Sequence, residues 1–239
     1  MRPFSRLHRG ILPLLLLSAV SSVNSARASL VFAGAIAGSG GGVGTSNVVL
    51  DVQATAIESG CVSWNGSANV TGIGTCPAGS GIVGGNEKLQ TTTRTVLETG
   101  VTSSSFLTVI MNPAEPSGDS IQVENLVLTI YNAAGTLLFT SGNLSAPVFF
   151  AASDPGAGSL GFGFTLDATQ AAASAGFINC PTCATNRFGL AASLTLSAGS
   201  PEVFSIINIT PEPVTLVTFA GGLAALALLR RYRRFHAKG

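Results

Sequence analysis

The stretch Ile121-Gln-Val-Glu-Asn-Leu-Val-Leu-Thr-Ile-Tyr131 decides the fold class of this chain. Apolar and polar residues alternate along it as in a β-strand, except near Asn125, where the alternation is interrupted and a β-bulge is expected. The turn residues Asn132-Ala-Ala-Gly135 follow, and a second strand-like stretch occupies residues 136–140. This pattern predicts an antiparallel β-hairpin.

More strand-like segments lie on both sides of the hairpin. The stretch 48–56 alternates with a period of two, 89–99 is rich in Thr and Val, and 106–111 is a short apolar run. Further strands are expected at 148–151, 160–166, 188–196 and 203–209, and one short helix at 168–175 with Asp167 as its cap. About nine strands without βαβ alternation predict an all-β fold, a single antiparallel β-sandwich of the jelly-roll or Ig-like type.

The composition excludes several classes of function. Only 10% of the 239 residues are charged and 46% are hydrophobic, which argues against intrinsic disorder. Residues 29–210 carry three basic and ten acidic side chains, so a nucleic-acid partner is not expected. Both histidines, His8 and His236, lie outside this stretch, which excludes a Ser-His-Asp triad and a His-ligated zinc within it. We expect no cofactor, no bound metal and no enzymatic activity.

The first 28 residues have the features of a signal peptide. Arginines at positions 2, 6 and 9 precede an apolar run of ten residues at 11–20, and Ala26-Arg27-Ala28 provides the small residues that signal peptidase requires. Ten residues span only about 15 Å as a helix, half of the bilayer core. We therefore expect the export machinery to translocate the chain and signal peptidase to remove residues 1–28, with Ala26 and Ala28 at the cleavage site.

Residues 211–239 form a second distinct segment. Pro211-Glu212-Pro213 is followed by 16 uncharged residues at 214–229 and then by the arginines Arg230, Arg231, Arg233 and Arg234. The apolar run predicts a C-terminal transmembrane helix of about 24 Å, slightly short for the bilayer core. The arginines beyond it follow the positive-inside rule, so residues 29–210 are expected outside the inner membrane. An ordinary single-span anchor is the alternative interpretation.

The Pro-Glu-Pro triplet, the short hydrophobic helix and the terminal arginine cluster together resemble the PEP-CTERM sorting tail of Gram-negative bacteria. The resemblance covers about 29 residues and is supported by the export signal at the other end. It implies processing by exosortase, an integral-membrane cysteine protease, with Pro211, Glu212, Pro213 and the four arginines as the sorting signal. It also implies transient anchoring in the inner membrane and a structural or adhesive role at the cell surface, in exopolysaccharide or a biofilm matrix.

The chain contains four cysteines, Cys61, Cys76, Cys180 and Cys183. An even number in an exported protein predicts two disulfides, and of the three connectivities we favour the local pairs Cys61–Cys76 and Cys180–Cys183. The Cys-Pro-Thr-Cys spacing at 180–183 also matches redox motifs and half of a zinc site.

Two further functions stay open for residues 29–210. A carbohydrate-binding module would use exposed aromatic side chains, for which Trp64, Tyr131, Phe149 and Phe150 are the candidates. A glycoside hydrolase needs only two suitably spaced carboxylates, and ten acidic residues are present. Loop acids such as Glu115 and Asp119 are candidates for binding calcium, although the EF-hand spacing is absent.

Overall fold

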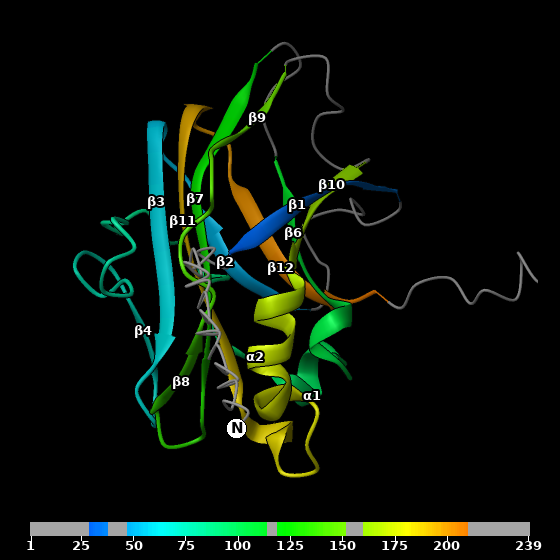
Figure 1. Cartoon of the computed structure of the whole chain (residues 1–239). Helices are drawn as coiled ribbons and strands as arrows, with labels where there is room; N and C mark the ends of the chain where they lie inside the picture. Colours follow the sequence, from blue (N-terminus) through cyan, green and yellow to red (C-terminus); the bar gives the residue numbers. More distant parts are fainter. Residues whose placement is uncertain (1–28, 38–46, 114–118, 152–159, 210–239) are drawn as a thin grey trace, which may run out of the picture.

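The computed structural model describes residues 29–37, 47–113, 119–151 and 160–209, and the chain there is built mainly from antiparallel strands (Figure 1). The predicted signal peptide 1–28 and the predicted sorting tail 211–239, including its apolar run, lie outside the described residues. None of the helices in the described part has the length and apolar character needed to cross a bilayer.

The strands form two sheets. One sheet has five strands in the order β1 (Leu30–Ala37), β10 (Leu160–Leu166), β6 (Leu107–Asn112), β12 (Glu202–Asn208) and β2 (Val48–Val52). The other has seven strands, of which five follow the order β4 (Asn69–Thr71), β3 (Thr55–Trp64), β11 (Arg187–Ala198), β7 (Ile121–Tyr131) and β8 (Leu137–Thr140). In addition, β5 (Arg94–Thr95) pairs with β11 and β9 (Val148–Phe150) pairs with β7. The all-β prediction is confirmed at this level.

The two sheets contribute to one hydrophobic core. Leu50, Phe164 and Phe204 of the five-stranded sheet and Leu128 and Leu190 of the seven-stranded sheet are all fully buried in the same cluster. Figure 1 shows the two sheets on opposite sides of the molecule, with the helices α1 (Val96–Thr99) and α2 (Ala168–Ile178) together at one end. Burial of these inner faces is the main source of stability for such a chain.

The predicted hairpin and its bulge are both present. β7 pairs with β8, and the Asn132 N–H donates to the Thr136 carbonyl at 3.0 Å across the connecting turn. The register between β7 and β11 shifts at Glu124, which has no directly opposed residue between Val123 and Asn125. The slip in the apolar pattern therefore marks a bulge.

The prediction of one strand at 48–56 is wrong. The chain forms β2, leaves it at Val52, and enters β3 of the other sheet at Thr55. All five residues of β2 are buried, including Asp51, because residues 86–92 cover the outer edge of the strand through backbone hydrogen bonds. Polar residues in this segment therefore did not mark a solvent-facing side.

The Thr-rich segment 89–99 is also not a strand over its length. Only Arg94–Thr95 pairs with β11, and the helix α1 begins at the next residue. Thr95 and Glu98 form a reciprocal capping box, in which the Thr95 Oγ1 accepts from the Glu98 N–H and the Glu98 carboxylate accepts from the Thr95 N–H. This local arrangement favours a helical turn over the strand that the Thr and Val content predicts.

The short helix is confirmed, whereas three strands were missed: β1, β3 beyond residue 56, and β4. α2 begins after Asp167, whose Oδ1 accepts from the Gln170 N–H at 2.8 Å, and it extends to Ile178. The strand β1 was not predicted, since its sequence Leu-Val-Phe-Ala-Gly-Ala-Ile-Ala lacks polar alternation.

A glycine in the central strand β11 tests the packing of the seven-stranded sheet. A Cβ atom added at Gly189 would lie 2.4 Å from the Val62 carbonyl oxygen and 2.7 Å from the Thr129 Oγ1. Because backbone cannot move aside cheaply, Gly189→Ala is expected to lower the free energy of unfolding by about 2–3 kcal/mol. In the matched control Gly176→Ala, the added Cβ meets nothing within 4 Å in the helix α2. That control should gain up to about 1 kcal/mol, and urea unfolding of both variants measures the contrast.

Candidate functional site

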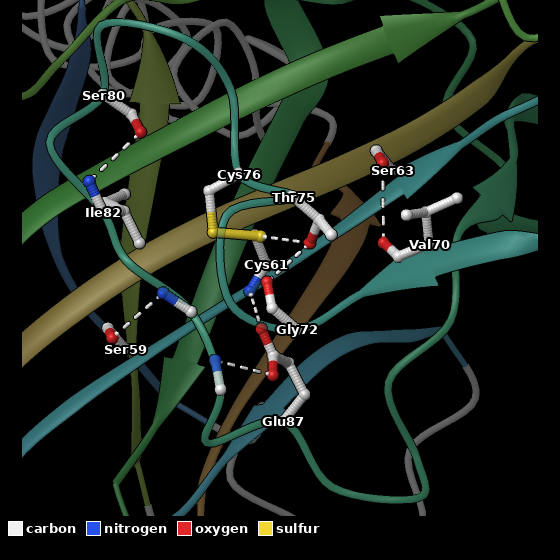
Figure 2. Close-up of a disulfide and its surroundings, with 12 residues drawn as sticks. Ser59, Cys61, Ser63, Val70, Gly72, Thr75, Cys76, Ser80, Ile82 and Glu87 are labelled. Carbon is white, nitrogen blue, oxygen red and sulfur yellow. Dashed lines mark hydrogen bonds between the residues drawn. A yellow bond between two sulfur atoms is a disulfide. The ribbon is translucent and has the colours of Figure 1, made fainter.

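A disulfide fastens a long loop to the outer face of the seven-stranded sheet. We name residues 72–87 the flap. Cys61 of β3 is bonded to Cys76 of the flap, with the two Cα atoms 5.4 Å apart (Figure 2). Cys61 forms a second, smaller apolar cluster with Ile82 of the flap, Val127 and Ala191, outside the main core. The flap is therefore held by both a covalent bond and apolar packing.

Glu87 closes the flap at its far end. Its Oε1 accepts from the Cys61 N–H at 2.7 Å and its Oε2 accepts from the Gly85 N–H at 2.9 Å, as Figure 2 shows. The sulfur atoms of Cys61 and Cys76 and a Glu87 carboxylate oxygen all lie within 4.8 Å of one another, which is a spacing suited to a metal ion. Since the two sulfurs are bonded to each other, no thiolate is available, and Glu87 serves here to position backbone. The role of Glu87 was not predicted, because Cys61, whose N–H donates to it, lies 26 positions away along the chain.

A cleft of about 330 Å³ lies beside the flap. Its walls come from the flap, from the outer face of β7, from the end of β8 and from the start of α2. The lining residues are Pro77, Ala78, Gly79, Ser80, Val127, Thr140, Gly142, Asn143 and Gln170. None of these residues is charged, and the polar ones offer hydroxyl and amide groups. The cleft therefore suits a neutral polar ligand better than an ion.

Hydrogen bonds across the cleft fix its walls. The Asn143 Nδ2 donates to the Gly79 carbonyl at 3.2 Å, and the Asn125 Nδ2 donates to the Ser80 carbonyl at 2.6 Å. On the opposite wall, the Gln170 Nε2 donates to the Ser141 carbonyl at 3.1 Å. These contacts join the flap to β7 and to the loop after β8, so the cleft is shaped by segments far apart in the sequence.

The predicted aromatic candidates do not form one platform. Tyr131 and Phe150 are buried in the protein, whereas Phe149 is 55% exposed and Trp64 is half-buried. Phe149 lies level with Ile57 through the strand pairings, seven residues from Trp64 along β3. At about 3.3 Å per residue, Phe149 and Trp64 are about 23 Å apart along the strand direction, and the three strand spacings between β9 and β3 add about 14 Å across the sheet.

Trp64 also has partners within the chain. The Arg187 guanidinium lies 4.1 Å from the centroid of the indole ring, in a cation–π contact. The indole N–H donates to the Ala133 carbonyl at 3.0 Å. Through these two contacts, Trp64 links β3 to β11 and to the β7–β8 turn.

The described carboxylates do not meet in the cleft. Asp51, Glu58 and Glu202 are buried, and Glu58 accepts from the Ala54 N–H and the Ser197 hydroxyl. Burial raises the pKa of Asp51, while the charge of Lys88 opposes this and that of Glu58 adds to it. Because the folded chain holds this proton more tightly than the unfolded chain, ionisation of Asp51 destabilises the fold as the pH rises above the usual carboxyl range.

The remaining acidic candidates have structural partners or lie elsewhere. The N–H of Thr95 lowers the pKa of Glu98 in the capping box, and Glu124 accepts from the Thr195 hydroxyl. Of the predicted calcium ligands, Asp119 is exposed and Glu115 lies outside the described residues. The cleft thus lacks the carboxylate pair that a glycoside hydrolase would require.

The second cysteine pair lies just beyond α2. Cys180 and Cys183 are bonded to each other, with their Cα atoms 5.1 Å apart, and Cys183 is buried. In this state the pair offers neither free thiols for redox chemistry nor ligands for zinc. Two disulfide pairs fit an oxidising compartment.

We call residues 29–210 the body. Its first strand begins and its last strand ends at the same end of the five-stranded sheet. Leu30 at the start of β1 pairs with Leu166 of β10, and Leu107 of β6 pairs with Asn208 at the end of β12. The intervening pairing of β10 with β6 keeps these residues in one row. Three strand spacings separate Leu30 from Asn208, or about 14 Å. The predicted cleavage-site residues Ala26 and Ala28 and the predicted sorting-signal residues Pro211–Pro213 and Arg230–Arg234 lie outside the described residues.

No protein-family model, characterised protein or solved structure matches this chain. The functional proposal therefore rests on the sequence and geometry of this chain alone.

Removal of each disulfide tests their unequal contributions. Cys61 and Cys76 are 15 positions apart, whereas Cys180 and Cys183 are three apart. The chain-entropy relation predicts a loss of about 3 kcal/mol for the double variant Cys61→Ala/Cys76→Ala and about 2 kcal/mol for Cys180→Ala/Cys183→Ala. Urea unfolding gives both values, and limited proteolysis should cut within 72–87 only in the first variant. Equal losses and an uncut flap would contradict the assigned role of Cys61–Cys76.

Proposed function

We propose that this chain is an exported protein of a bacterial cell surface or extracellular matrix, delivered across the inner membrane and processed at its C-terminal tail by exosortase. Residues 29–210 then act as a β-sandwich module with a structural or adhesive role in exopolysaccharide or a biofilm. The tail supplies the sorting signal through Pro211, Glu212, Pro213 and the four arginines.

The shared exit of the two flanks is the observation that carries this proposal. A protein held by a terminal membrane segment must present that end to the bilayer, and a signal peptide enters the same bilayer during export. Leu30 and Asn208 lie at one end of the five-stranded sheet, so both segments can engage one membrane without crossing the body. The flap and its cleft lie on the other sheet and face away from the core.

The disulfides and the composition of the body support the same proposal. Both disulfides favour an oxidising environment, which is found outside the inner membrane. The body has an acidic balance of charges and no histidine, which fits a passive module better than acid–base catalysis at neutral pH.

Intact-mass measurement of the surface form from its native host tests the sorting proposal. We expect loss of residues 1–28 and of the segment after about Pro213, because signal peptidase and exosortase act on the two ends. A Pro211→Ala/Pro213→Ala variant should keep its arginine tail and stay in the membrane fraction. The matched control Pro201→Ala changes the similar Pro-Glu pair before β12 and should be processed normally. A surface form that retains Arg230–Arg234 would leave only the ordinary anchor.

The neutral cleft favours carbohydrate binding as a second candidate function. Its hydroxyl and amide groups suit sugar hydroxyls, and its volume is at the lower end of ligand pockets. The Trp64 indole instead contacts the Arg187 guanidinium and donates to the Ala133 carbonyl, which argues against Trp64 as an aromatic platform for a sugar.

Measuring the affinity for the exopolysaccharide of the host distinguishes a binding site in the cleft from one at Trp64. The double variant Thr140→Val/Asn143→Ala removes two polar groups from the cleft and should weaken binding about tenfold. Trp64→Ala is the comparison and should leave the affinity unchanged. The opposite pattern would move the site to Trp64, and binding by neither the parent chain nor the variants would exclude this second function.

A further inference from the structure

The body begins with a buried residue that contacts a carboxylate. Ser29 is 3% exposed and Leu30 is 1% exposed. The backbone nitrogen of Ser29 donates to the Oδ2 of Asp167 at 3.1 Å, across 138 positions of sequence. A donor at this place would ordinarily be satisfied by a neighbouring strand, so its pairing with a charged group is a distinctive feature.

The Asp167 carboxylate is held in place by a second role. Its Oδ1 accepts from the Gln170 N–H at 2.8 Å and caps the helix α2, while its own carbonyl accepts from the Ala171 N–H at 2.8 Å. With one oxygen fixed by the helix, the other is directed at Ser29. The carboxylate is therefore positioned before any change occurs at Ser29.

Removal of the signal peptide would change the chemistry of this nitrogen. Hydrolysis after Ala28 breaks the bond between the Ala28 carbonyl carbon and the Ser29 nitrogen. The hydroxyl of water adds to the Ala28 carbonyl carbon, and the remaining hydrogen of water goes to the Ser29 nitrogen. The signal peptide leaves with a C-terminal carboxylate, and the Ser29 nitrogen becomes a free amine. An α-amine has an ordinary pKa of about 7.7–8.0, so it takes up a further proton near neutral pH.

We propose that signal cleavage after Ala28 converts the part-buried Ser29–Asp167 hydrogen bond into an ion pair, which locks β1 onto the N-terminus of α2 in the mature protein. This inference rests on the proposed export of the chain. The bond to the neutral N–H already has an ionised acceptor. A protonated amine adds a direct attraction between opposite charges, so maturation stabilises the end of the sheet from which the tail also leaves.

The surroundings leave this pair without a competing charge. The strands β1, β10 and β6, the helix α2, and the 3-10 turn Ser104–Phe106 between them contain no ionisable side chain. β7, which also contacts β1, carries Glu124 and Tyr131, and Glu124 is bonded to Gln122 and Thr195. Among the described residues of these elements and the loops that join them, Asp167 is the carboxylate that accepts a hydrogen bond from the Ser29 nitrogen.

The ion pair predicts a definite pH dependence. Burial at Ser29 disfavours the charged amine, whereas the adjacent Asp167 carboxylate favours it. The proposal requires the carboxylate to outweigh burial, so that the pKa of the amine is higher in the folded protein than in the unfolded chain. The added stability is then complete below the ordinary pKa of about 7.7–8.0 and is lost as the pH rises through the folded value.

Four forms of the full chain, exported and purified from the membrane or surface fraction, test the proposal. They are the parent, Asp167→Asn, a chain with one threonine inserted between Ala28 and Ser29, and the combination of both changes. Asparagine keeps the helix cap without the charge. The insertion moves the amine one residue away and leaves Ser29 with a neutral N–H that still reaches Asp167. N-terminal sequencing comes first and should find Ser29, or the added threonine, as the first residue.

Thermal unfolding between pH 6.5 and pH 10 then measures the ion pair. In the parent background, Asp167→Asn should lower the Tm by about 4–8 °C at pH 6.5 and by less than half of that at pH 10. In the insertion background the loss should be small and independent of pH. Should Asp167→Asn fail to fold, the parent and the insertion chain alone must still differ in their pH dependence.

The outcomes separate this inference from the proposed function. A chain that keeps residues 1–28 would overturn both export and the ion pair. Cleavage at another bond would leave export intact and overturn the ion pair, because the amine would not be at Ser29. Cleavage at Ser29 with equal effects of Asp167→Asn in both backgrounds would also overturn the ion pair alone.

Discussion

The antiparallel register of β1, β10, β6 and β12 fixes the relative positions of the start of β1, the end of β12 and Asp167. Because each strand reverses the direction of the last, the start of β1 and the end of β12 must lie in one row. The same register brings the start of β1 beside Leu166, and Asp167 is the next residue along the chain. A shift of one residue in the β1–β10 pairing would turn the buried side chains of β1 outward and separate Ser29 from its carboxylate.

Local signals in the sequence were sufficient for part of this fold. The β7–β8 hairpin and the cap of α2 depend on residues within a few positions of one another, and both were predicted. The bulge in β7 was also predicted, because it interrupts the local apolar pattern even though its partner strand β11 is distant in sequence. The single strand predicted at 48–56 failed for a different reason. Residues 48–56 cross from one sheet to the other, and Asp51 is covered by a segment about 40 positions away. Alternation of residue types cannot report a covering segment that is distant in sequence.

The candidate site was predictable to a smaller degree. Close spacing along the chain suggested the two cysteine pairs that the structure contains. The cleft was not foreseeable, because its lining comes from the flap, from β7 and β8, and from α2, which meet only in the folded chain. Trp64 illustrates the opposite error: a lone tryptophan looks available in the sequence, yet Arg187 and Ala133 use its ring and its N–H. Contacts between distant segments decide whether a side chain is free to bind a ligand.

The small number of basic residues in the body bears on the proposed effect of cleavage after Ala28. Burial raises the pKa of Asp51, and the charge of Lys88 offsets this only in part. Asp167 differs, since a positive charge would reach it only when the chain is cut after Ala28. A neutral amide already occupies that position in the uncut chain, so the strand can fold first and gain the charge afterwards. In the proposed maturation, this end of the five-stranded sheet gains stability only after cleavage, so the unprocessed chain is easier to unfold than the processed one.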